Sequence, residues 1–417
     1  MNRPDSDVLV LGAGVIGLTC ALELLRAGRS VTVLESGVAG GGSSHGNCGT
    51  ITPSHLPLHA PGTLARALRW MLTRDAPFYV KPTADPQMLG WLLRFATRCN
   101  RGDFRRTALY KSRLLLQSRE QLAALIARER IDCEFAATGT LYVWRHEKGL
   151  AQARDDARLL GELGIAVEIL DAPTLHRREP ALRSGMAGGH FHPGDASLRP
   201  DRHVAELARL VRARGGAIAE RTPVQAFDTA AGRIEAVVTP RGRYRGREVV
   251  LALGAWSAPL ARQIGLRLPI QPGKGYSITY SRPRRAPAIP LVLEERSVCV
   301  TAWDSGYRLG STMEFSGYDT TLNAARLAAL RRGAAEYLDE PEGPVIEEQW
   351  YGWRPMTYDD LPLIGRTGRY ANLTLATGHG MLGMSLSAIT GQLVADVLAG
   401  RTPALDIAPL SPRRFGA

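Results

Sequence analysis

The stretch DVLVLGAGVIGLTCALELLRAGRSVTVLE at residues 7–35 constrains the fold more than any other part of the chain. Its apolar run at 8–11 is too short for a helix, and the glycine pattern GAGVIG at 12–17 follows at once. In such a turn the first glycine allows a tight bend, the second lets backbone approach a pyrophosphate, and the third lets the helix pack on the strand. An amphipathic helix and a second strand at 30–34 complete a predicted βαβ unit.

The acidic residue at the end of this unit limits which dinucleotides can bind. Phosphates would sit on the helix N-terminus, where free N–H groups and the helix dipole attract negative charge. Glu35 closes the second strand, where a carboxylate accepts both ribose hydroxyls and repels a 2′-phosphate. The sequence therefore predicts NAD or FAD binding, and the alternative is a buried βαβ unit that holds no ligand.

A loop rich in glycine and serine, SGVAGGGSSHGNCGTITP at 36–53, follows the second predicted strand. Because it starts at the same sheet edge, it can run across the cofactor and donate hydrogen bonds to its phosphates and ring. Ser43, Ser44 and Asn47 are the best candidates for these contacts, and His45 and His55 lie close by in the sequence. The alternative is a flexible surface loop, since glycine and serine are also linker residues.

Two further glycine turns follow buried strands later in the chain. The first, at Gly254, follows REVVLAL, and the second, GHGMLGM at 378–384, lies between a strand at 373–376 and a helix at 385–398. One dinucleotide does not need two pyrophosphate cradles, whereas a reduced flavin ring carries negative charge that a helix N-terminus stabilises. The far end of the chain therefore favours FAD over NAD.

The middle of the chain has a different pattern. From Gly139 onward, short strands alternate with helices and glycine turns. The segments PIQPGKGYSITY, PLVLEE, SVCVTAW and YRLGST predict an antiparallel meander, with one face on a core and the other along a cavity. The sequence thus predicts an α/β fold with a second domain built around an antiparallel sheet.

The charge balance indicates anionic partners. Lys and Arg outnumber Asp and Glu by 52 to 40, which gives a formal charge of +12 and a pI near 9.8. The arginines are scattered and no nucleic-acid motif is present, so we expect no nucleic acid as partner. Residues 64–98 mix Leu, Trp and Met with Arg at helical spacing. Exposed, they would lie on an anionic membrane surface; buried, they form an ordinary helix pair.

The spacing of the cysteines and the length of the apolar runs indicate the cellular compartment of the protein. The chain has no C-x-x-C pair, which argues against a zinc or dithiol site and fits reduced thiols, and we expect no metal. Its five cysteines are Cys20, Cys48, Cys99, Cys133 and Cys299. No apolar run is long enough to cross a bilayer, and MNRPDSD leads into the first strand without a signal peptide. We therefore expect a cytoplasmic protein, with peripheral attachment to the inner face of the plasma membrane as a further option.

Motifs along almost the whole chain resemble those of the D-amino-acid oxidase superfamily of flavoproteins, specifically the D-amino-acid dehydrogenase small-subunit type. The matching stretches are VLGAGVIGL, GNCGTITP, APGTLARALRWM, KGYSIT, YGWRPMTYDDLPLIGRT and NLTLATGHGMLGMSLSAITGQLVADVLAGR. The resemblance implies a Rossmann-like FAD-binding domain at 1–80, 196–265 and 350–417. It also implies an α+β substrate domain with an antiparallel sheet at 81–195 and 266–349.

The same resemblance assigns roles to single residues. The implied cofactor contacts are Gly12, Gly14, Val15, Ile16, Gly17, Glu35, Ser43, Ser44, Asn47, Gly49, Val224, Gly254, Gly378, His379, Gly380, Met381, Leu382, Gly383 and Met384. Arg354 of GWRPMT resembles the arginine that clamps the substrate carboxylate, and the alternative is a structural ion pair with Asp359 or Asp360. Tyr276 and Tyr307 are candidates to close the pocket or to sit in the core. His55 is a weaker catalytic candidate, as a lone histidine is more often structural.

The implied chemistry is oxidative deamination of a D-amino acid. A neutral amine drives the Cα hydride onto flavin N5 without a general base, so the protein has to orient the C–H bond. A guanidinium grips a carboxylate by two parallel bonds, which fixes its plane as a lysine does not. Some relatives attach the flavin covalently, through a Cys in the region of Arg354 or a His in the early glycine loop. This sequence has no Cys near Arg354, and its His45 is one residue away from the position of such a histidyl linkage. We therefore predict non-covalent FAD.

Four functions stay open on the sequence alone. The leading hypothesis is a D-amino-acid dehydrogenase that passes electrons to a quinone or another membrane acceptor, because no second Rossmann fingerprint for NAD(P) is present. The alternatives are a dehydrogenase of cyclic D-imino acids such as D-proline or cis-4-hydroxy-D-proline, an oxidase of D-amino acids or glycine that uses O2, and a non-catalytic FAD-binding subunit.

Overall fold

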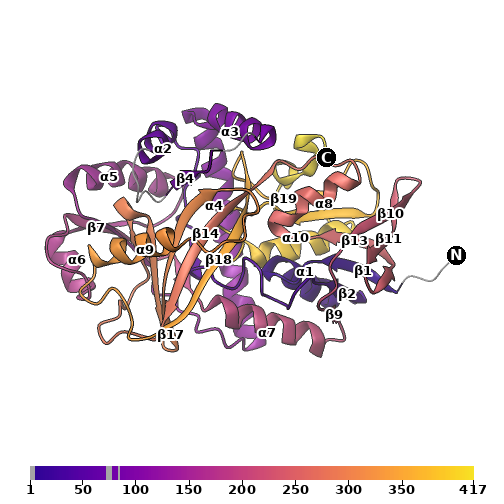
Figure 1. The fold of residues 1–417 in the computed structure, drawn as a ribbon, viewed down its shortest axis with the longest axis horizontal. Helices are drawn as coiled ribbons and strands as arrows, with labels where there is room; N and C mark the ends of the chain where they lie inside the picture. Colours follow the sequence, from indigo (N-terminus) through magenta and orange to yellow (C-terminus); the bar gives the residue numbers. More distant parts are fainter. Residues whose placement is uncertain (1–4, 72–77, 83–84) are drawn as a thin grey trace.

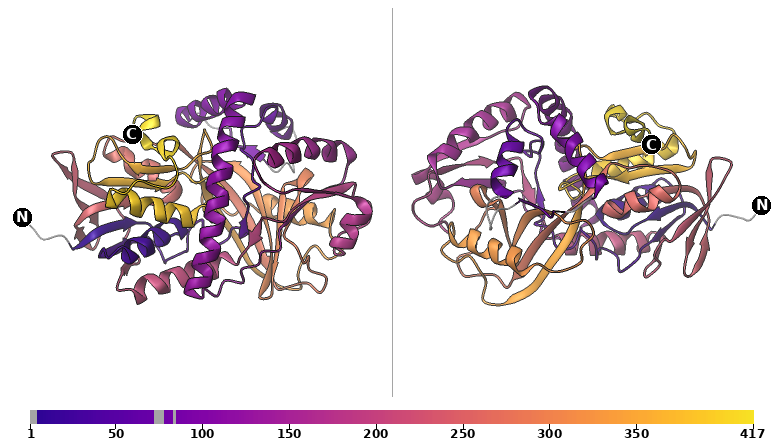
Figure 2. Two further views of the ribbon diagram at one scale, coloured as in Figure 1. Left: turned by 180° about the vertical axis from the view of Figure 1, so that it is seen from behind. Right: turned by 45° about the horizontal axis from the view of Figure 1, so that its top comes forward.

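Two sheets stand side by side and define the architecture (Figure 1). The structure is a computed structural model that describes residues 5–71, 78–82 and 85–417. One sheet has six strands and the other has nine, with smaller sheets of three and two strands. The long helix α4 (Arg101–Glu129) runs between the two halves, as Figure 2 shows most clearly from behind.

The six-stranded sheet carries the predicted βαβ unit. Its strand order is β19-β20-β13-β1-β2-β9, and all neighbours are parallel except β19 and β20. Its strands are β1 (Ser6–Leu11), β2 (Val31–Leu34), β9 (Ala217–Ala219), β13 (Gly246–Leu251), β19 (Leu363–Arg366) and β20 (Leu373–Thr377). Strands far apart in the chain thus meet in one sheet, and the predicted α/β class is confirmed. The exact domain boundaries stay a prediction.

Helices and a small sheet cover both faces of these strands. On one face, α1 (Val15–Arg26) packs against α7 (Pro200–Ala213) and α10 (Ser387–Ala399). The other face packs against α8 (Ser257–Gln263) and the three-stranded sheet of β10 (Ala226–Ala230), β11 (Arg233–Thr239) and β12 (Gly242–Tyr244). Burial on both faces explains why β1 reads as a continuous apolar run.

The nine-stranded sheet is the predicted meander, extended by strands from earlier in the chain. Its order is β18-β14-β17-β16-β15-β5-β7-β6, with β4 paired to β17. The strands are β4 (Phe78–Val80), β5 (Thr140–Trp144), β6 (Glu168–Asp171), β7 (Gly188–His192), β14 (Ile270–Tyr280), β15 (Leu291–Leu293), β16 (Val298–Trp303), β17 (Gly306–Phe315) and β18 (Ile346–Thr357). Residues 350–357, which we assigned to the FAD-binding domain, pair with β14 in this sheet.

The two faces of the nine-stranded sheet differ in chemistry. One face packs its apolar and tyrosine side chains against α9 (Ala324–Ala335) and α6 (Ala172–Arg178). The strand pairings place a polar row on the other face, because paired residues on neighbouring strands point to the same side. The row is His190, Tyr142, Val292, Cys299, Gly310, Ser277 and Trp350. We call this side of the sheet the polar face.

The remaining elements frame these sheets. Helices α2 (Thr63–Met71) and α3 (Pro86–Arg98) lie together at the top of Figure 1. Helix α5 (Glu147–Glu162) contacts β5 and β7. The two-stranded sheet joins β3 (Thr50–Ile51) to β8 (Ala196–Ser197). Short 3-10 helices are η1 (Gly254–Trp256), η2 (Glu294–Arg296), η3 (Ala408–Leu410) and η4 (Pro412–Phe415).

We predict that Gly17→Ala destabilises the protein by about 2 kcal/mol or more, because added volume has nowhere to go in a packed site. A Cβ at Gly17 would lie 1.8 Å from the carbonyl oxygen of Gly12, which is backbone and has little freedom to move. The control is Gly161→Ala on the exposed side of α5, where a Cβ meets nothing within 4 Å. Helix propensity favours alanine at Gly161 by up to about 1 kcal/mol. Thermal unfolding followed by circular dichroism compares the two variants, and equal Tm values would contradict the packing argument.

Candidate functional site

The glycine turn after β1 forms a cradle at the N-terminus of α1. Gly12 has φ +102°, and a Cβ there would lie 2.7 Å from the carbonyl oxygen of Ala252. Gly14 is the N-cap and offers no side-chain acceptor, whereas the Ser44 hydroxyl accepts from the Val15 N–H at 3.0 Å. The Glu35 carboxylate accepts from the Ala13 N–H at 2.8 Å, which holds the acid at the turn. Bare backbone at a helix N-terminus is the arrangement that fits a pyrophosphate.

Two other glycine turns lie at neighbouring strand ends. Gly254 has φ +55° and follows β13, while Gly378 and Gly380 have φ +76° and +56° and follow β20. The Thr377 hydroxyl donates to the Gly254 carbonyl at 3.0 Å and so ties the two turns together. Because β20, β13 and β1 are adjacent and parallel, all three turns lie along one sheet edge, where α/β proteins bind their ligands.

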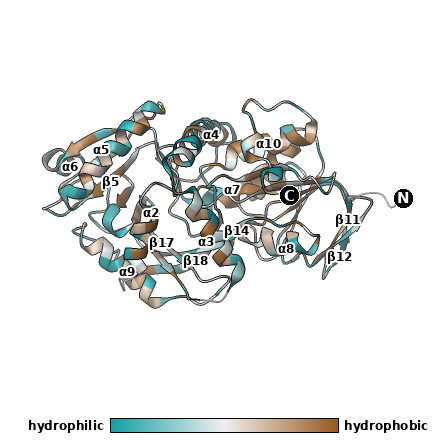
Figure 3. Cartoon of the chain, turned by 90° about the horizontal axis from the view of Figure 1, so that it is seen from above, coloured by the Kyte–Doolittle hydropathy of each residue, from teal (hydrophilic) through white to brown (hydrophobic). Residues whose placement is uncertain are grey.

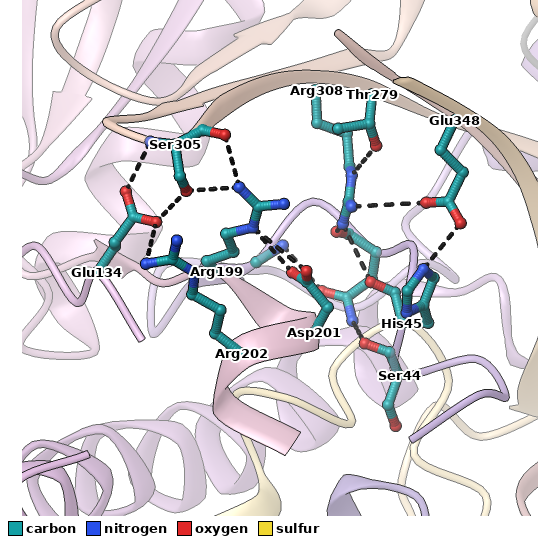
Figure 4. Close-up of polar contacts among 12 residues, drawn as sticks. Ser44, His45, Glu134, Arg199, Asp201, Arg202, Thr279, Ser305, Arg308 and Glu348 are labelled. Atoms are coloured by element: carbon teal, nitrogen blue, oxygen red, sulfur yellow. Dashed lines mark hydrogen bonds and ion pairs between the residues drawn. The ribbon is translucent and has the colours of Figure 1, made fainter. Parts of the chain in front are cut away.

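The loop at 43–54, which we call the bridging loop, connects this cradle to the polar face of the nine-stranded sheet (Figure 4). The Ser43 hydroxyl donates to the Trp353 carbonyl at 2.6 Å, and the His45 imidazole contacts the Glu348 carboxylate at 2.8 Å. Arg308, which is only 1% exposed, donates to the carbonyls of His45 and Asn47. The bridging loop is therefore held on the sheet and not free in solvent.

Asn47 organises the same loop from within. Its Nδ2 donates to the Ser44 carbonyl and its Oδ1 accepts from the Gly49 N–H, both at 2.8 Å. Gly49 has φ +70°, and a Cβ there would meet the Leu198 carbonyl oxygen at 1.9 Å. In this structure the Asn47 side chain shapes the turn, and a direct cofactor contact of Asn47 stays a prediction.

Six half-buried side chains lie on the bridging loop, just after it, or on and beside the polar face, and we infer that they line an internal cavity there. Each keeps part of its surface accessible and so belongs neither to the core nor to the outer surface. They are Cys48, His55, Tyr142, Glu294, Cys299 and Arg354. Sequence reasoning found only His55 and Arg354 among them. Period-two alternation in TLYVW and VCVTAW is the signal that points to Tyr142 and Cys299, whereas Cys48 and Glu294 carry no local signal.

Arg354 on β18 is a cation without a carboxylate partner among the described residues. Its Nη1 donates to the Thr312 carbonyl at 2.8 Å, and a Cβ on Gly275 would lie 2.1 Å from the same nitrogen. The two acids that could have paired with it are engaged elsewhere, Asp359 with Arg414 and Asp360 with the buried Lys111. Burial lowers the pKa of the Arg354 guanidinium, which is the effect expected for a charge without a counter-ion.

The structure places two free cysteines that are far apart in the sequence close together. Cys299 on β16 pairs with Gly310 on β17, and the Cys48 Sγ lies 2.5 Å from where a Gly310 Cβ would be. Cys48 and Cys299 are hydrogen-bonded, and both lie near Arg354. A loop and a strand that are distant in sequence supply the two thiols, so spacing rules did not detect them. The Cys299 hydrogen bond, Arg308 and Arg354 lower the pKa of Cys48.

Several predicted residues point away from this cavity. Tyr276 and Tyr307 lie on the apolar face of the sheet, where they are 1% and 0% exposed, so alternation places them opposite Cys299 and Ser277. The Tyr307 hydroxyl donates to the Pro341 carbonyl at 3.2 Å. His379 turns into α10, where its Nε2 lies 2.9 Å from the Thr390 hydroxyl, and burial lowers its pKa to about 3.

Other predicted residues lie nearer the expected positions. His55 is 3.5 Å from the Lys111 ammonium, and burial together with this charge lowers its pKa to about 4. Val224 packs against the hydrophobic core. Two residues earlier, the Thr222 N–H donates to the Glu35 carbonyl, which ties this segment to the end of β2. In the turn after β20, Leu382 and Met384 are buried in the core and Met381 is 36% exposed. The Gly380 N–H donates to the Pro355 carbonyl, which holds this turn beside Arg354.

Comparisons with known proteins agree with this geometry. The family model described as FAD dependent oxidoreductase matches residues 7–397. A D-amino acid dehydrogenase of Rhizorhabdus wittichii is 37% identical over 98% of this chain and 100% of its own length, and one of Agrobacterium fabrum is 35% identical over 99% and 100%. The fold is similar to glycine oxidase from Geobacillus kaustophilus, with TM-score 0.79, 24% identity and 98% of both chains covered. L-proline dehydrogenase from P. horikoshii superposes with TM-score 0.76 at 20% identity, covering 99% of this chain and 98% of the other.

These matches span nearly the whole chain, so it belongs to the family of FAD-dependent oxidoreductases. FAD is its cofactor, and the glycine cradle, the α1 N-terminus and Glu35 fit its adenosine diphosphate half. Non-covalent attachment stays a prediction, and the two thiols near Arg354 make it worth testing: flavin that stays with the polypeptide after acid precipitation would contradict it.

We predict that Cys48 is the first cysteine to be alkylated by iodoacetamide near neutral pH, because thiolate is the reacting species and its pKa is the lowered one. Burial raises the pKa of Cys133 to about 12 and also raises that of Cys20. Mass spectrometry of timed digests gives the order of labelling. Cys299→Ala should slow Cys48, and added FAD should protect it. Equal rates at Cys48, Cys20 and Cys133 would contradict the assignment.

Proposed function

We propose that this FAD-dependent oxidoreductase oxidises the Cα–N bond of D-amino acids and passes the electrons to an acceptor other than NAD(P). One observation carries the proposal: the Arg354 guanidinium lines the cavity and has no carboxylate partner among the residues described. A buried cation without a counter-charge is costly unless a ligand supplies the anion. The relatives named D-amino acid dehydrogenase support a carboxylate-bearing substrate.

The roles of the chain's own residues follow from the geometry. Arg354 binds the substrate carboxylate through parallel N–H donors and so fixes its plane. Gly275 leaves room for the guanidinium, and the Thr312 carbonyl fixes its direction. When bound, FAD supplies the acceptor for the Cα hydride. The proposed FAD contacts are the glycine turns at 12–17, 254 and 378–384, together with Glu35, Ser43, Ser44, Asn47, Gly49 and Val224.

The acceptor side of the proposal rests on the surface of α2 and α3. None of the helices that the structure describes is long and apolar enough to cross a membrane. Leucines nevertheless face solvent on both helices: Leu64, Leu68, Leu89 and Leu93 are 40%, 62%, 49% and 69% exposed. Arg66 and Arg94 are exposed beside them, and Figure 3 shows the mixed apolar and polar character of this side. Trp91 is not part of this surface, because it is buried and donates to the Pro269 carbonyl.

Exposed leucines flanked by arginines are the pattern of a surface that contacts anionic lipid. We therefore infer peripheral contact with an anionic membrane through α2 and α3, and a quinone as the acceptor reached there. The cyclic D-imino acid, O2-using and non-catalytic alternatives have no particular observation in their favour. Anaerobic bleaching of the flavin by a panel of D-amino and D-imino acids, followed by a choice of quinone or O2, separates all of them.

We predict that Arg354→Met raises KM for D-amino acids by about tenfold or more and leaves the flavin bound, because a charge-assisted pair to a carboxylate is lost. Arg354→Lys should recover part of the affinity, since it restores the charge but not the parallel donors. Steady-state kinetics and the flavin absorption spectrum measure both effects. Arg366→Met, which breaks the surface pair with Glu248, is the matched control. An unchanged KM in Arg354→Met would remove Arg354 from the substrate site.

We predict that Leu68→Ser combined with Leu93→Ser weakens binding to anionic vesicles by about tenfold or more, because two leucines lose their insertion into the lipid interface. Co-sedimentation with phosphatidylglycerol vesicles at low salt gives the bound fraction, and added salt should release the wild-type protein. The control combines Val38→Ser with Val345→Ser, two valines that are 51% and 59% exposed and belong to neither α2 nor α3. If wild type ignores the vesicles, or both double variants lose binding alike, this surface is not the contact.

A further inference from the structure

The cavity wall contains a second charged group, Glu294, that the proposed oxidation of a D-amino acid does not use. Strand β15 pairs with β5 and β16 so that Val292 joins Tyr142 and Cys299 on the polar face. Leu293 is completely buried on the apolar face, so alternation returns Glu294 to the cavity side. Glu294 then opens η2 and ends the strand at the edge of the cavity.

The Glu294 carboxylate has no partner among the residues that the structure describes: it accepts no hydrogen bond and forms no ion pair. Its neighbour Glu295 is different, because it accepts from the Arg145 and His146 N–H groups and from the Tyr337 hydroxyl. Enclosed carboxylates are normally hydrogen-bonded or paired. Burial raises the pKa of Glu294 to about 7, and Arg66 opposes this effect from α2.

The sheet order separates Arg354 from Glu294. Arg354 lies on β18 and Glu294 follows β15, and Cys299 on β16 lies between them in the order β18-β14-β17-β16-β15. Both charges also act on the pKa of Cys299. The pKa of Glu294 responds instead to Arg66 on α2, Asp156 on α5 and Glu295, and that of Arg354 responds to Cys48 and Cys299. Counting only the residues that the structure describes, the cavity thus presents a cation without a counter-ion toward β18 and an anion without a counter-ion toward β15.

This separation decides which part of a substrate meets Glu294. In an α-amino acid the nitrogen is only two bonds from the carboxyl carbon, so it stays at the Arg354 end. The side chain extends from the same Cα and is the part that reaches past Cys299. A carboxylate at the far end of the pocket would then select what the side chain carries.

We propose that Glu294 is a specificity-determining residue that binds the cationic end of the side chain of a basic D-amino acid, one that ends in an ammonium or a guanidinium. This proposal rests on the proposed oxidation of D-amino acids and names the substrate class of the same site. Charge complementarity is the physical basis: the ligand's carboxylate meets Arg354 and its distal cation meets Glu294, so both enclosed charges are paired at once.

The first test compares D-arginine and D-lysine with D-norleucine, whose side chain is similar in length and uncharged. Anaerobic flavin reduction gives a rate and an apparent Kd for each substrate. We expect wild type to favour the basic substrates in the ratio of rate to Kd by about tenfold or more. Glu294→Gln should abolish this preference and leave D-norleucine unchanged, and Glu294→Asp should keep part of it. Glu162→Gln, which removes a surface charge paired with Arg105, is the matched control.

The preference should also depend on pH. Glu294 has a raised pKa near 7, so it becomes charged as the pH rises through that value, and the preference for basic substrates should grow between about pH 6 and about pH 8. The ratio of basic to neutral substrate removes changes common to both, such as ionisation of the α-amine. A ratio that stays flat with pH in wild type, or that rises equally in Glu294→Gln, would overturn the assignment.

A second test does not depend on turnover. δ-Guanidinovalerate and valerate both carry the carboxylate and lack the α-amine, so their binding can be followed by the shift of the flavin spectrum in the holoenzyme. We expect the guanidino compound to bind about tenfold more tightly or better in wild type, and equally with valerate in Glu294→Gln.

The outcomes separate the two proposals. Turnover of D-norleucine with no advantage for basic substrates or for δ-guanidinovalerate overturns the role of Glu294 and leaves the proposed function standing. Equal losses for D-norleucine and D-arginine in Glu294→Gln would show that the carboxylate acts on a part common to all substrates, which also overturns it. No flavin reduction by any D-amino acid, with δ-guanidinovalerate still bound through Glu294, would overturn the proposed function alone.

Discussion

The hydrogen bonds from Arg308 to the bridging loop hold the two halves of the site in one place. This guanidinium is buried, and it donates to the carbonyls of His45 and Asn47 and to the Thr279 hydroxyl. A buried cation is tolerated only when its donors are satisfied, so the loop has little freedom to leave the sheet. The same loop reaches the α1 N-terminus through Ser44 and the polar face through Cys48. One short stretch of chain therefore contacts both the cradle and the strand that carries Arg354.

The nine-stranded sheet can serve as a cavity wall because one of its faces forms a hydrophobic core and the other carries the functional side chains. Its apolar face, with Tyr276, Tyr280 and Tyr307, packs on α9 and supplies a core of its own. Its polar face is thereby free to carry groups that make poor core residues, such as Tyr142, Cys299 and Arg354. Small residues on this face, Gly275 and Gly310, leave space for the Arg354 guanidinium and the Cys48 thiol. A side chain at either position would fill the space that now holds a functional group.

How much the sequence predicts depends on how local the determinant is. The βαβ unit, Glu35 and the late glycine turns depend on neighbours a few residues apart, so their periodicity and glycine spacing identify them. Arg354 was found through its motif, and its unpaired state required the structure. For Tyr276 and Tyr307 the sequence identified the strands and left both the pocket and the core open, because the sequence of a strand in a sheet covered on both sides does not show which side is the core. The structure places both tyrosines in the core. Cys299 and Glu294 come together because β15, β16 and β17 pair with one another, and Cys48 joins them from a loop that is distant in the sequence. No local sequence pattern encodes these contacts.

Unpaired charges in an enclosed wall are themselves a constraint on what the cavity can bind. Among the residues that the structure describes, Arg354 and Glu294 have no counter-ion, which destabilises the protein without a ligand, and the charge of Arg66 only opposes the rise of the Glu294 pKa. Asp360, which is close to Arg354 in the sequence, forms its ion pair with Lys111 instead. Arg354 and Glu294 are therefore preorganised, since a ligand that carries both complementary charges can bind without breaking an existing ion pair. A neutral ligand satisfies neither charge and a simple carboxylate only one, so the wall discriminates by how many of its charges a ligand completes.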